Sequence, residues 1–151
     1  MRWSDTLILI DVNVLVYGHR EDAPDHPDYA AWLEDATTSE SPFGISDLAL
    51  SGFLRVVTHP GIFASPTPVE IALDFVSSLR ARPRAIPIRP GSGHWDIFIR
   101  LCRQTKARGN RIPDAYHAAL AIESGSEWIT TDRGFARFPG LKWAHPLAST
   151  A

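Results

Sequence analysis

Acidic residues gather at the ends of the strands and helices that the sequence predicts. Four of them share this placement: Asp11, Asp47, Asp114 and Asp132. Because ligands of open α/β sheets bind outside the carboxyl ends of the strands, these carboxylates are expected to converge on one pocket. Carboxylates held close together repel one another, which raises at least one of their pKa values and favours a bound cation. Oxygen ligands without a cysteine cluster favour Mg²⁺ or Mn²⁺ over zinc.

Each acid also has a structural interpretation. Asp47 and Asp114 would each be stabilised by the positive end of a helix dipole, and Asp132 in Thr-Thr-Asp-Arg-Gly would suit a turn. Asp11 has the weakest structural explanation, because it ends a very apolar strand and precedes Val-Asn-Val. Spacing alone leaves both interpretations open.

Short strands alternating with helices would position these acids. Five strand-like segments are predicted, at residues 7–10, 43–45, 85–88, 128–130 and 141–144. Apolar residues between them recur at helical spacing, as in the stripe Trp95, Phe98, Ile99 and Cys102, which also places Trp95 in the core. The alternation predicts an α/β fold: a mostly parallel sheet of about five strands with helices on both faces, in three α/β/α layers.

Local signals predict where several helices begin and end. Ser46 is a good N-cap for the helix after the second strand. Thr67-Pro68-Val69-Glu70 has the pattern of a capping box, and Gly125 is placed to end the helix that Pro113 opens. His117 would share a helix face with Asp114, and we expect it to be packed rather than to act as a ligand or base.

Length and composition bound the class of protein. The 151 residues, 44% hydrophobic and 21% charged, predict one globular domain spanning residues 1–151 and argue against disorder. The sequence has no apolar run of about 18 residues for a membrane span, and its start lacks the features of a secretory signal. The single cysteine, Cys102, excludes an internal disulfide. We therefore expect a cytoplasmic protein with no membrane partner.

The charge distribution is more informative than the net charge of −2, which is not typical of a nucleic-acid binder. Thirteen of the 15 basic residues are arginine, whose planar side chain suits phosphates and carboxylates. Many lie in two stretches: Arg80, Arg82, Arg84 and Arg89, then Arg100, Arg103, Lys106, Arg108 and Arg111. A solvated helix face explains such a stretch equally well.

Three segments around the acids resemble the motifs of PIN-domain nucleases. They are Leu-Ile-Asp11-Val-Asn13-Val-Leu-Val-Tyr, Asn110-Arg-Ile-Pro-Asp114-Ala-Tyr-His, and Ile129-Thr130-Thr-Asp132-Arg-Gly-Phe. The segment at residues 50–60 is similar to one seen in VapC toxins of VapBC toxin–antitoxin systems. Each motif is weak alone, but the three occur in the family's order, and the resemblance extends from about residue 7 to 147.

The resemblance implies an endoribonuclease toxin that cuts RNA with Mg²⁺ or Mn²⁺. It assigns metal-site roles to Asp11, Asp114 and Asp132, and supporting polar roles to Asn13 and Thr130. A carboxylate-held metal would activate water and neutralise charge on the phosphate, with Asp11 and Asp114 as direct ligands. Asp132 and Asp47 would act through water or position a second ion. Arg108 and Arg111 flank Asp114 and are the candidates to bind RNA phosphates. The resemblance also implies a homodimer and inhibition by a VapB antitoxin.

One position departs from the family pattern. A glutamate usually stands in the second helix, six residues after the serine that follows the strand, and here that position is Gly52. Asp47, five residues earlier, would approach the site from a different direction, because a helix turns about 100° per residue. The missing glutamate leaves an alternative open, a non-catalytic PIN-like domain that binds RNA or a partner. Receiver or phosphatase domains fit less well, since Asn13 stands where such a phosphatase has an aspartate.

Overall fold

A five-stranded parallel sheet forms the centre of the computed structural model, which describes residues 6–148. Its strands are β1 (Ile8–Ile10), β2 (Phe43–Ile45), β3 (Ala85–Pro87), β4 (Glu127–Ile129) and β5 (Trp143–Ala144). They lie in the order β3-β2-β1-β4-β5, and every neighbouring pair is parallel. The predicted strands are confirmed, with the last one shorter than expected.

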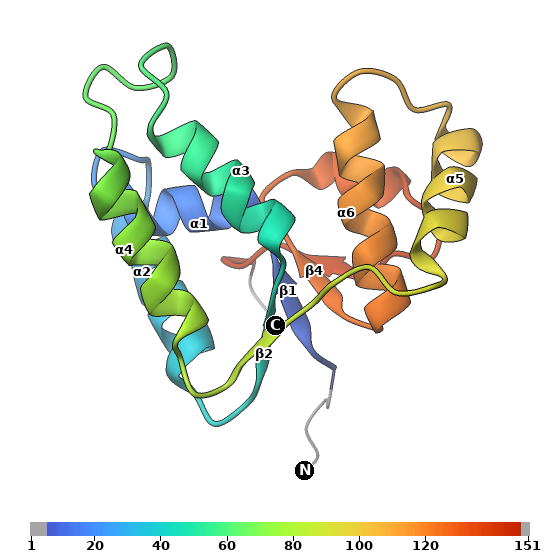
Figure 1. The fold of residues 1–151 in the computed structure, drawn as a ribbon, viewed down its shortest axis with the longest axis horizontal. Helices are drawn as coiled ribbons and strands as arrows, with labels where there is room; N and C mark the ends of the chain where they lie inside the picture. The colour runs from blue at the N-terminus through green and yellow to red at the C-terminus, as the bar shows by residue number, and fades with distance from the viewer. Residues whose placement is uncertain (1–5, 149–151) are drawn as a thin grey trace.

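Helices cover both faces of this sheet (Figure 1). They are α1 (Val12–His19), α2 (His26–Thr38), α3 (Asp47–Val57), α4 (Val69–Arg80), α5 (His94–Thr105) and α6 (Arg111–Ser124), with a short 3₁₀ helix, η1 (Arg133–Arg137). Helices α1 to α4 lie on one side of the strands, and α5 and α6 on the other. The predicted three-layer α/β/α architecture is confirmed. Within residues 6–148, no helix combines the length and apolarity needed to cross a membrane.

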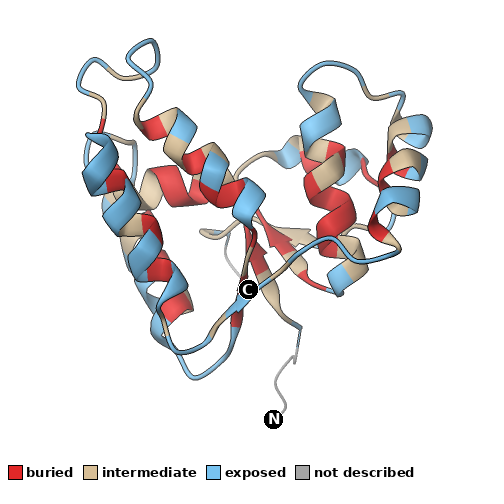
Figure 2. Ribbon diagram, in the orientation of Figure 1, coloured by how far each residue is buried: buried red, intermediate tan, exposed pale blue. Residues whose placement is uncertain are grey.

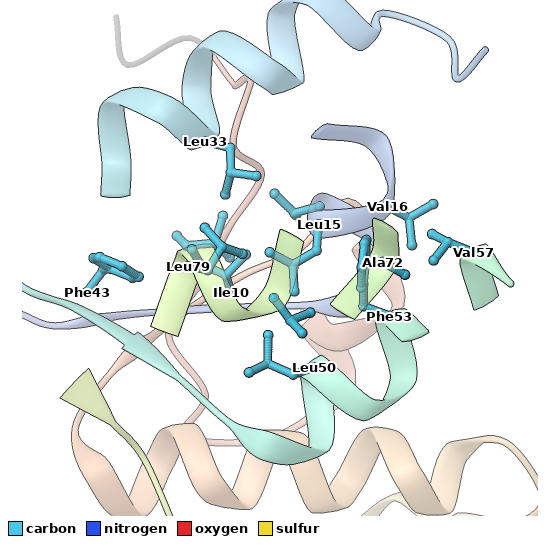
Figure 3. Close-up of a cluster of buried hydrophobic side chains, with 13 residues drawn as sticks. Ile10, Leu15, Val16, Leu33, Phe43, Leu50, Phe53, Val57, Ala72 and Leu79 are labelled. Carbon is cyan, nitrogen blue, oxygen red and sulfur yellow. The ribbon is translucent and has the colours of Figure 1, made fainter. Parts of the chain in front are cut away.

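Strand alternation divides the core into two clusters. Leu9 on β1 is in register with Trp128 on β4, and both side chains pack against α5 and α6. Their neighbours Ile10 and Ile129, also in register, pack against the helices of the other layer. Successive side chains of a strand point to opposite faces, so both faces of these central strands are buried. Figure 2 shows the buried positions on the two sides of the sheet, and Figure 3 the cluster that contains Ile10.

The predicted helix boundaries are partly confirmed. Ser46 caps α3 by accepting a hydrogen bond from the Ala49 amide at 3.0 Å, and Gly125 ends α6 with a φ of 68°. The capping box before α4 does not form, because the Thr67 hydroxyl accepts a hydrogen bond from Arg20 at 3.2 Å instead.

The predicted core position of Trp95 is wrong. Helix α5 buries the stripe formed by His94, Phe98 and Leu101, which is rotated relative to the predicted one. Trp95 therefore lies beside the buried stripe, and it is 61% exposed.

Candidate active site

The strand order places a pocket at the carboxyl ends of β1 and β4. The chain leaves β1 for β2 on one side and reaches β4 on the other, and such a switch point is where open α/β sheets bind ligands. A pocket of about 610 Å³ lies there, and Asp11, Asp114 and Asp132 all line it. We call it the acid pocket. The structure therefore brings three of the four predicted acids together.

Asp11 lines the acid pocket and is only 6% exposed. It follows β1 directly and is the N-cap of α1, where its Oδ1 accepts a hydrogen bond from the Val12 amide at 2.6 Å. Its Oδ2 accepts from the Thr130 hydroxyl at 2.7 Å and from Asn13 Nδ2 at 3.2 Å. These bonds fix the orientation of the carboxylate.

Asn13 and Thr130 also connect the two strand ends. Asn13 Oδ1 accepts a hydrogen bond from the Thr131 amide at 3.1 Å, and Thr130 Oγ1 accepts from the Asp132 amide at 3.0 Å. The segment after β4 is thereby held against the start of α1. The structure places both predicted supporting residues beside Asp11.

Asp114 and Asp132 share one guanidinium group. Arg111 Nη1 lies 3.3 Å from Asp114 Oδ2 and 4.0 Å from Asp132 Oδ2. Asp114 stands in the first turn of α6, and Asp132 is the N-cap of η1, where it accepts from the Gly134 amide at 2.8 Å. Arg111, predicted to bind RNA, therefore lies at the acids and neutralises part of their charge.

Burial changes the protonation of the acids. Loss of hydration raises the pKa of Asp11 from 3.8 to about 6, even though the hydrogen bonds from Thr130 and Val12 act to lower it. Burial likewise raises the pKa of Asp114, against the lowering effect of its hydrogen bond with Arg111. Repulsion among the carboxylates adds to both shifts but is not the largest cause. The predicted direction is confirmed, and its main physical cause is desolvation.

The donor set of the acid pocket fits a hard cation. Within residues 6–148, no three acidic, histidine or cysteine side chains already stand at metal-binding spacing. Mg²⁺ does not need such a group, since it keeps several water ligands and uses one or two carboxylates directly. The converging oxygen donors, one of them buried with a raised pKa, suit a cation of this kind.

Asp47 lies apart from these acids. It lines a neighbouring hollow whose walls are mostly apolar, formed by Ser46, Asp47, Leu48, Ile88, Arg89, Pro90, Phe98, Ile112, Pro113, Tyr116 and Leu120. We call this hollow the apolar pocket. The Asp47 side chain is 65% exposed and pairs with Arg80 from the end of α4. The structure does not bring Asp47 to the acid pocket.

Gly52 lines the acid pocket at the position where the family pattern has a glutamate. A Cβ atom added at Gly52 would lie 2.8 Å from Cγ2 of Val12, which is closer than real contacts allow. Helices α1 and α3 approach each other at this point, and the Val12 side chain fills the space. A glutamate at this position would require Val12 to move.

Sequence reasoning missed other residues of the pocket. Arg55 and Asn110 both line it, and each lies within a segment that carries the family resemblance. Arg137, on η1, is close enough to Asp114 to lower its pKa. Arg137 stands only five residues after Asp132, with a turn between them, and this closeness in the sequence could have pointed to it.

His117 also lines the acid pocket, and it is packed as expected. Its ring stacks on Trp128 with the centroids 5.1 Å apart, and burial lowers its pKa to about 4. Its Nδ1 has no hydrogen-bond partner among the described residues. The imidazole is therefore neutral at physiological pH.

The sequence matches the PIN domain family over residues 8–141. The chain belongs to the PIN-domain family. The match includes all the residues of the acid pocket, from Asp11 to Phe135.

Curated relatives of this PIN domain are named ribonucleases of the VapC group, to which the chain also belongs. Ribonuclease VapC43 of Mycobacterium tuberculosis is 45% identical over 141 residues, covering 93% of this chain and 96% of VapC43. Ribonuclease VapC25 of the same organism is 36% identical over 140 residues, covering 93% of this chain and 99% of VapC25. PIN-domain ribonucleases of this group generally depend on metal ions.

Solved structures share the fold of this PIN domain. VapBC2 from Rickettsia felis, bound to a DNA fragment from its promoter, superimposes with a TM-score of 0.68 at 19% identity, covering 93% of this chain and 98% of the other. VapBC-1 from nontypeable Haemophilus influenzae superimposes with a TM-score of 0.68 at 16% identity. The superposition covers 95% of this chain and 100% of the other.

Proposed function

We propose that this protein is an Mg²⁺- or Mn²⁺-dependent endoribonuclease that acts as the toxin of a VapBC-type toxin–antitoxin pair. The observation that supports it best is the convergence of Asp11, Asp114 and Asp132 on one pocket, at the switch point of a VapC-family chain. A bound divalent cation supplies charge neutralisation and an activated water for phosphodiester hydrolysis.

The residues of the pocket have distinct roles in this proposal. Asp11 and Asp114 would hold the cation, and Asp132 would add negative charge beside them. Thr130 and Asn13 keep the Asp11 carboxylate in place, since both donate hydrogen bonds to its Oδ2, and the bond from Thr130 also acts to lower its pKa. His117, neutral and packed on Trp128, supports the wall of the pocket.

Arginine side chains supply the positive charge that an acidic site lacks. Arg55 lines the pocket, and Arg111 bridges Asp114 and Asp132. Arg108 is exposed in the segment just before α6. We assign Arg108 and Arg111 to the RNA backbone, because guanidinium groups pair well with phosphates. Arg111, which now contacts Asp114 and Asp132, would then be placed to contact a phosphate beside the acids.

The proposed partners are RNA, a VapB-type antitoxin and a second copy of the chain. Solved VapBC complexes of the same fold support the antitoxin. The apolar pocket supports a protein contact, because Leu48 and Ile112 at its edge are both large apolar side chains exposed to solvent. Sedimentation of the chain alone and with its antitoxin tests both contacts.

A cleavage assay tests the proposed function. We expect the purified chain to cut RNA with Mg²⁺ or Mn²⁺, and EDTA to stop the reaction. A non-catalytic PIN-like domain, the alternative that Gly52 favours, would bind RNA or a partner without any metal-dependent product. RNA that stays intact with either ion would contradict the nuclease proposal.

A further inference from the structure

The outer face of α5 combines an exposed aromatic ring with unpaired positive charge. Trp95, Ile99 and Arg103 follow one another at four-residue spacing, so they lie on one side of the helix. With Asp96, Arg100 and Gln104, they line a shallow depression of about 490 Å³. The acid pocket shares none of these residues.

Trp95 presents its ring to solvent. One side of the indole contacts Phe98, with the ring centroids 5.3 Å apart, and 61% of the residue remains exposed. A large aromatic side chain placed this way leaves most of its apolar surface in contact with water. The buried Phe98 supports one side of the indole, and the exposed side can stack on a flat ligand.

The charge of this face differs from that of the protein as a whole. Residues 94–108 contain four basic side chains and one acidic side chain, whereas the whole chain has a net charge of −2. Among the described residues, neither Arg100 nor Arg103 forms an ion pair with an acid. These guanidinium groups are therefore available to an anionic ligand.

The C-terminal end of this face leads toward the acid pocket. Helices α5 and α6 lie side by side and are joined by a short loop, so the end of α5 is next to the start of α6, where Asp114 stands (Figure 1). Lys106 and Arg108 lie in that loop and continue the positive charge. The 12 residues of α5 span about 18 Å, roughly the length of five stacked nucleotides.

We infer that the Trp95–Arg103 face binds single-stranded RNA outside the cleavage site, with a base stacked on Trp95 and phosphates on Arg100 and Arg103. The inference rests on the proposed ribonuclease function, because it names how the substrate is held. Aromatic stacking with a positively charged track is how proteins bind single strands without reading sequence. A symmetric contact between two copies is disfavoured, since it would bring the same positive side chains together.

Binding of fluorescent oligoribonucleotides of 4 and 12 nucleotides in EDTA tests the inference. Trp95→Ala should weaken binding of both oligonucleotides about five- to a hundredfold, because both are long enough to reach from Trp95 to the arginines. Trp95→Phe, which keeps an aromatic face, should retain most of the affinity. Replacing Arg100 and Arg103 with alanine should lower the salt slope for the 12-mer by about 0.7 for each charge.

Two variants elsewhere on the surface serve as matched controls. Ile71→Ala removes an exposed apolar side chain of α4, and Arg84→Ala removes one exposed positive charge from the segment between α4 and β3. Both should bind the 12-mer as the natural protein does. Equal affinity of Trp95→Ala and the natural protein would overturn the inference, and so would a loss for Trp95→Phe as large as that for Trp95→Ala.

Two further measurements separate the possible failures. If the natural protein cuts neither oligonucleotide with Mg²⁺ or Mn²⁺, the proposed function fails. If cleavage proceeds and Trp95→Ala cuts both lengths normally, only the RNA-binding face fails. Sedimentation of Trp95→Ala should match that of the natural protein, and dissociation of a dimer would overturn the inference in favour of a contact between copies.

Discussion

The acid pocket and the apolar pocket have about the same volume, 610 Å³, and share Leu48 and Pro113 in their walls. Only the acid pocket is lined by several carboxylates, those of Asp11, Asp114 and Asp132. Asp11 and Asp132 come after the central strands β1 and β4, each caps the helix that follows, and both line the acid pocket. Asp47 follows β2, but Ser46 takes the capping position, and Asp47 points to solvent and Arg80. The capping position therefore separates Asp11 and Asp132 from Asp47, whereas Asp114 reaches the acid pocket from the first turn of α6.

The largest expected effect is that of Asp114→Asn on cleavage. This variant removes a proposed metal ligand, so the rate should fall roughly a hundredfold or more. Its metal-free melting temperature should be no lower than that of the natural protein, because burial already disfavours the Asp114 charge. Cleavage rates and thermal melts in EDTA check both statements. A melting temperature well below the natural value would identify Asp114 as a structural residue.

The buried carboxylate of Asp11 should make stability depend on pH. Its pKa is about 6 in the folded protein, against an ordinary value of 3.8, so the folded protein holds the proton more tightly than the unfolded chain does. The resulting penalty is absent below pH 3.8, grows as pH rises, and reaches about 3 kcal/mol above pH 6.

Asp11→Asn removes this titration. In EDTA, the natural protein should therefore lose stability relative to Asp11→Asn as the pH rises from about 4.5 to about 7.5. Urea unfolding of both proteins across this range measures the difference. If the difference stays constant with pH, Asp11 does not have a raised pKa.

Restoring the glutamate of the family pattern should strain the contact between α1 and α3. Gly52→Glu should destabilise the protein by about 1–3 kcal/mol, because the new Cβ collides with Val12. Val12→Ala in the same chain should recover part of the loss, giving a measurable coupling between the two sites. Urea unfolding of the two single variants and the double variant completes the cycle. Additive effects would show that the Val12 side chain is not the obstacle.

The smallest expected effect is that of Asp47→Asn. Its ion pair with Arg80 is solvent-exposed, so stability should fall by less than about 1 kcal/mol, with cleavage unchanged. The same assays used for Asp114→Asn provide the comparison. A clear loss of cleavage or metal affinity would show that Asp47 reaches the metal in the active state and would remove the distinction between the two pockets.

Local patterns in the sequence were enough to predict the layered architecture and three acids of the site. Alternating apolar runs and helical stripes predict strands and helices from local spacing, and parallel strands direct their carboxyl ends to one edge. Asp11, Asp114 and Asp132 were therefore predictable from their places after strands or at a helix start. Ser46 and Gly125 were predictable as caps for the same reason, because capping depends on neighbouring residues.

Contacts between distant segments determine which side chains face which pocket, and local spacing does not contain them. The Thr67 hydroxyl does not cap α4 as predicted, because it accepts a hydrogen bond from Arg20, 47 residues away in the sequence. The tight fit of Gly52 against Val12 depends on how α3 packs against α1, and the exposure of Trp95 depends on the rotation of α5 against α6. Periodicity predicts that a helix has an apolar face, but a rotation of one residue, about 100°, moves a side chain from core to solvent.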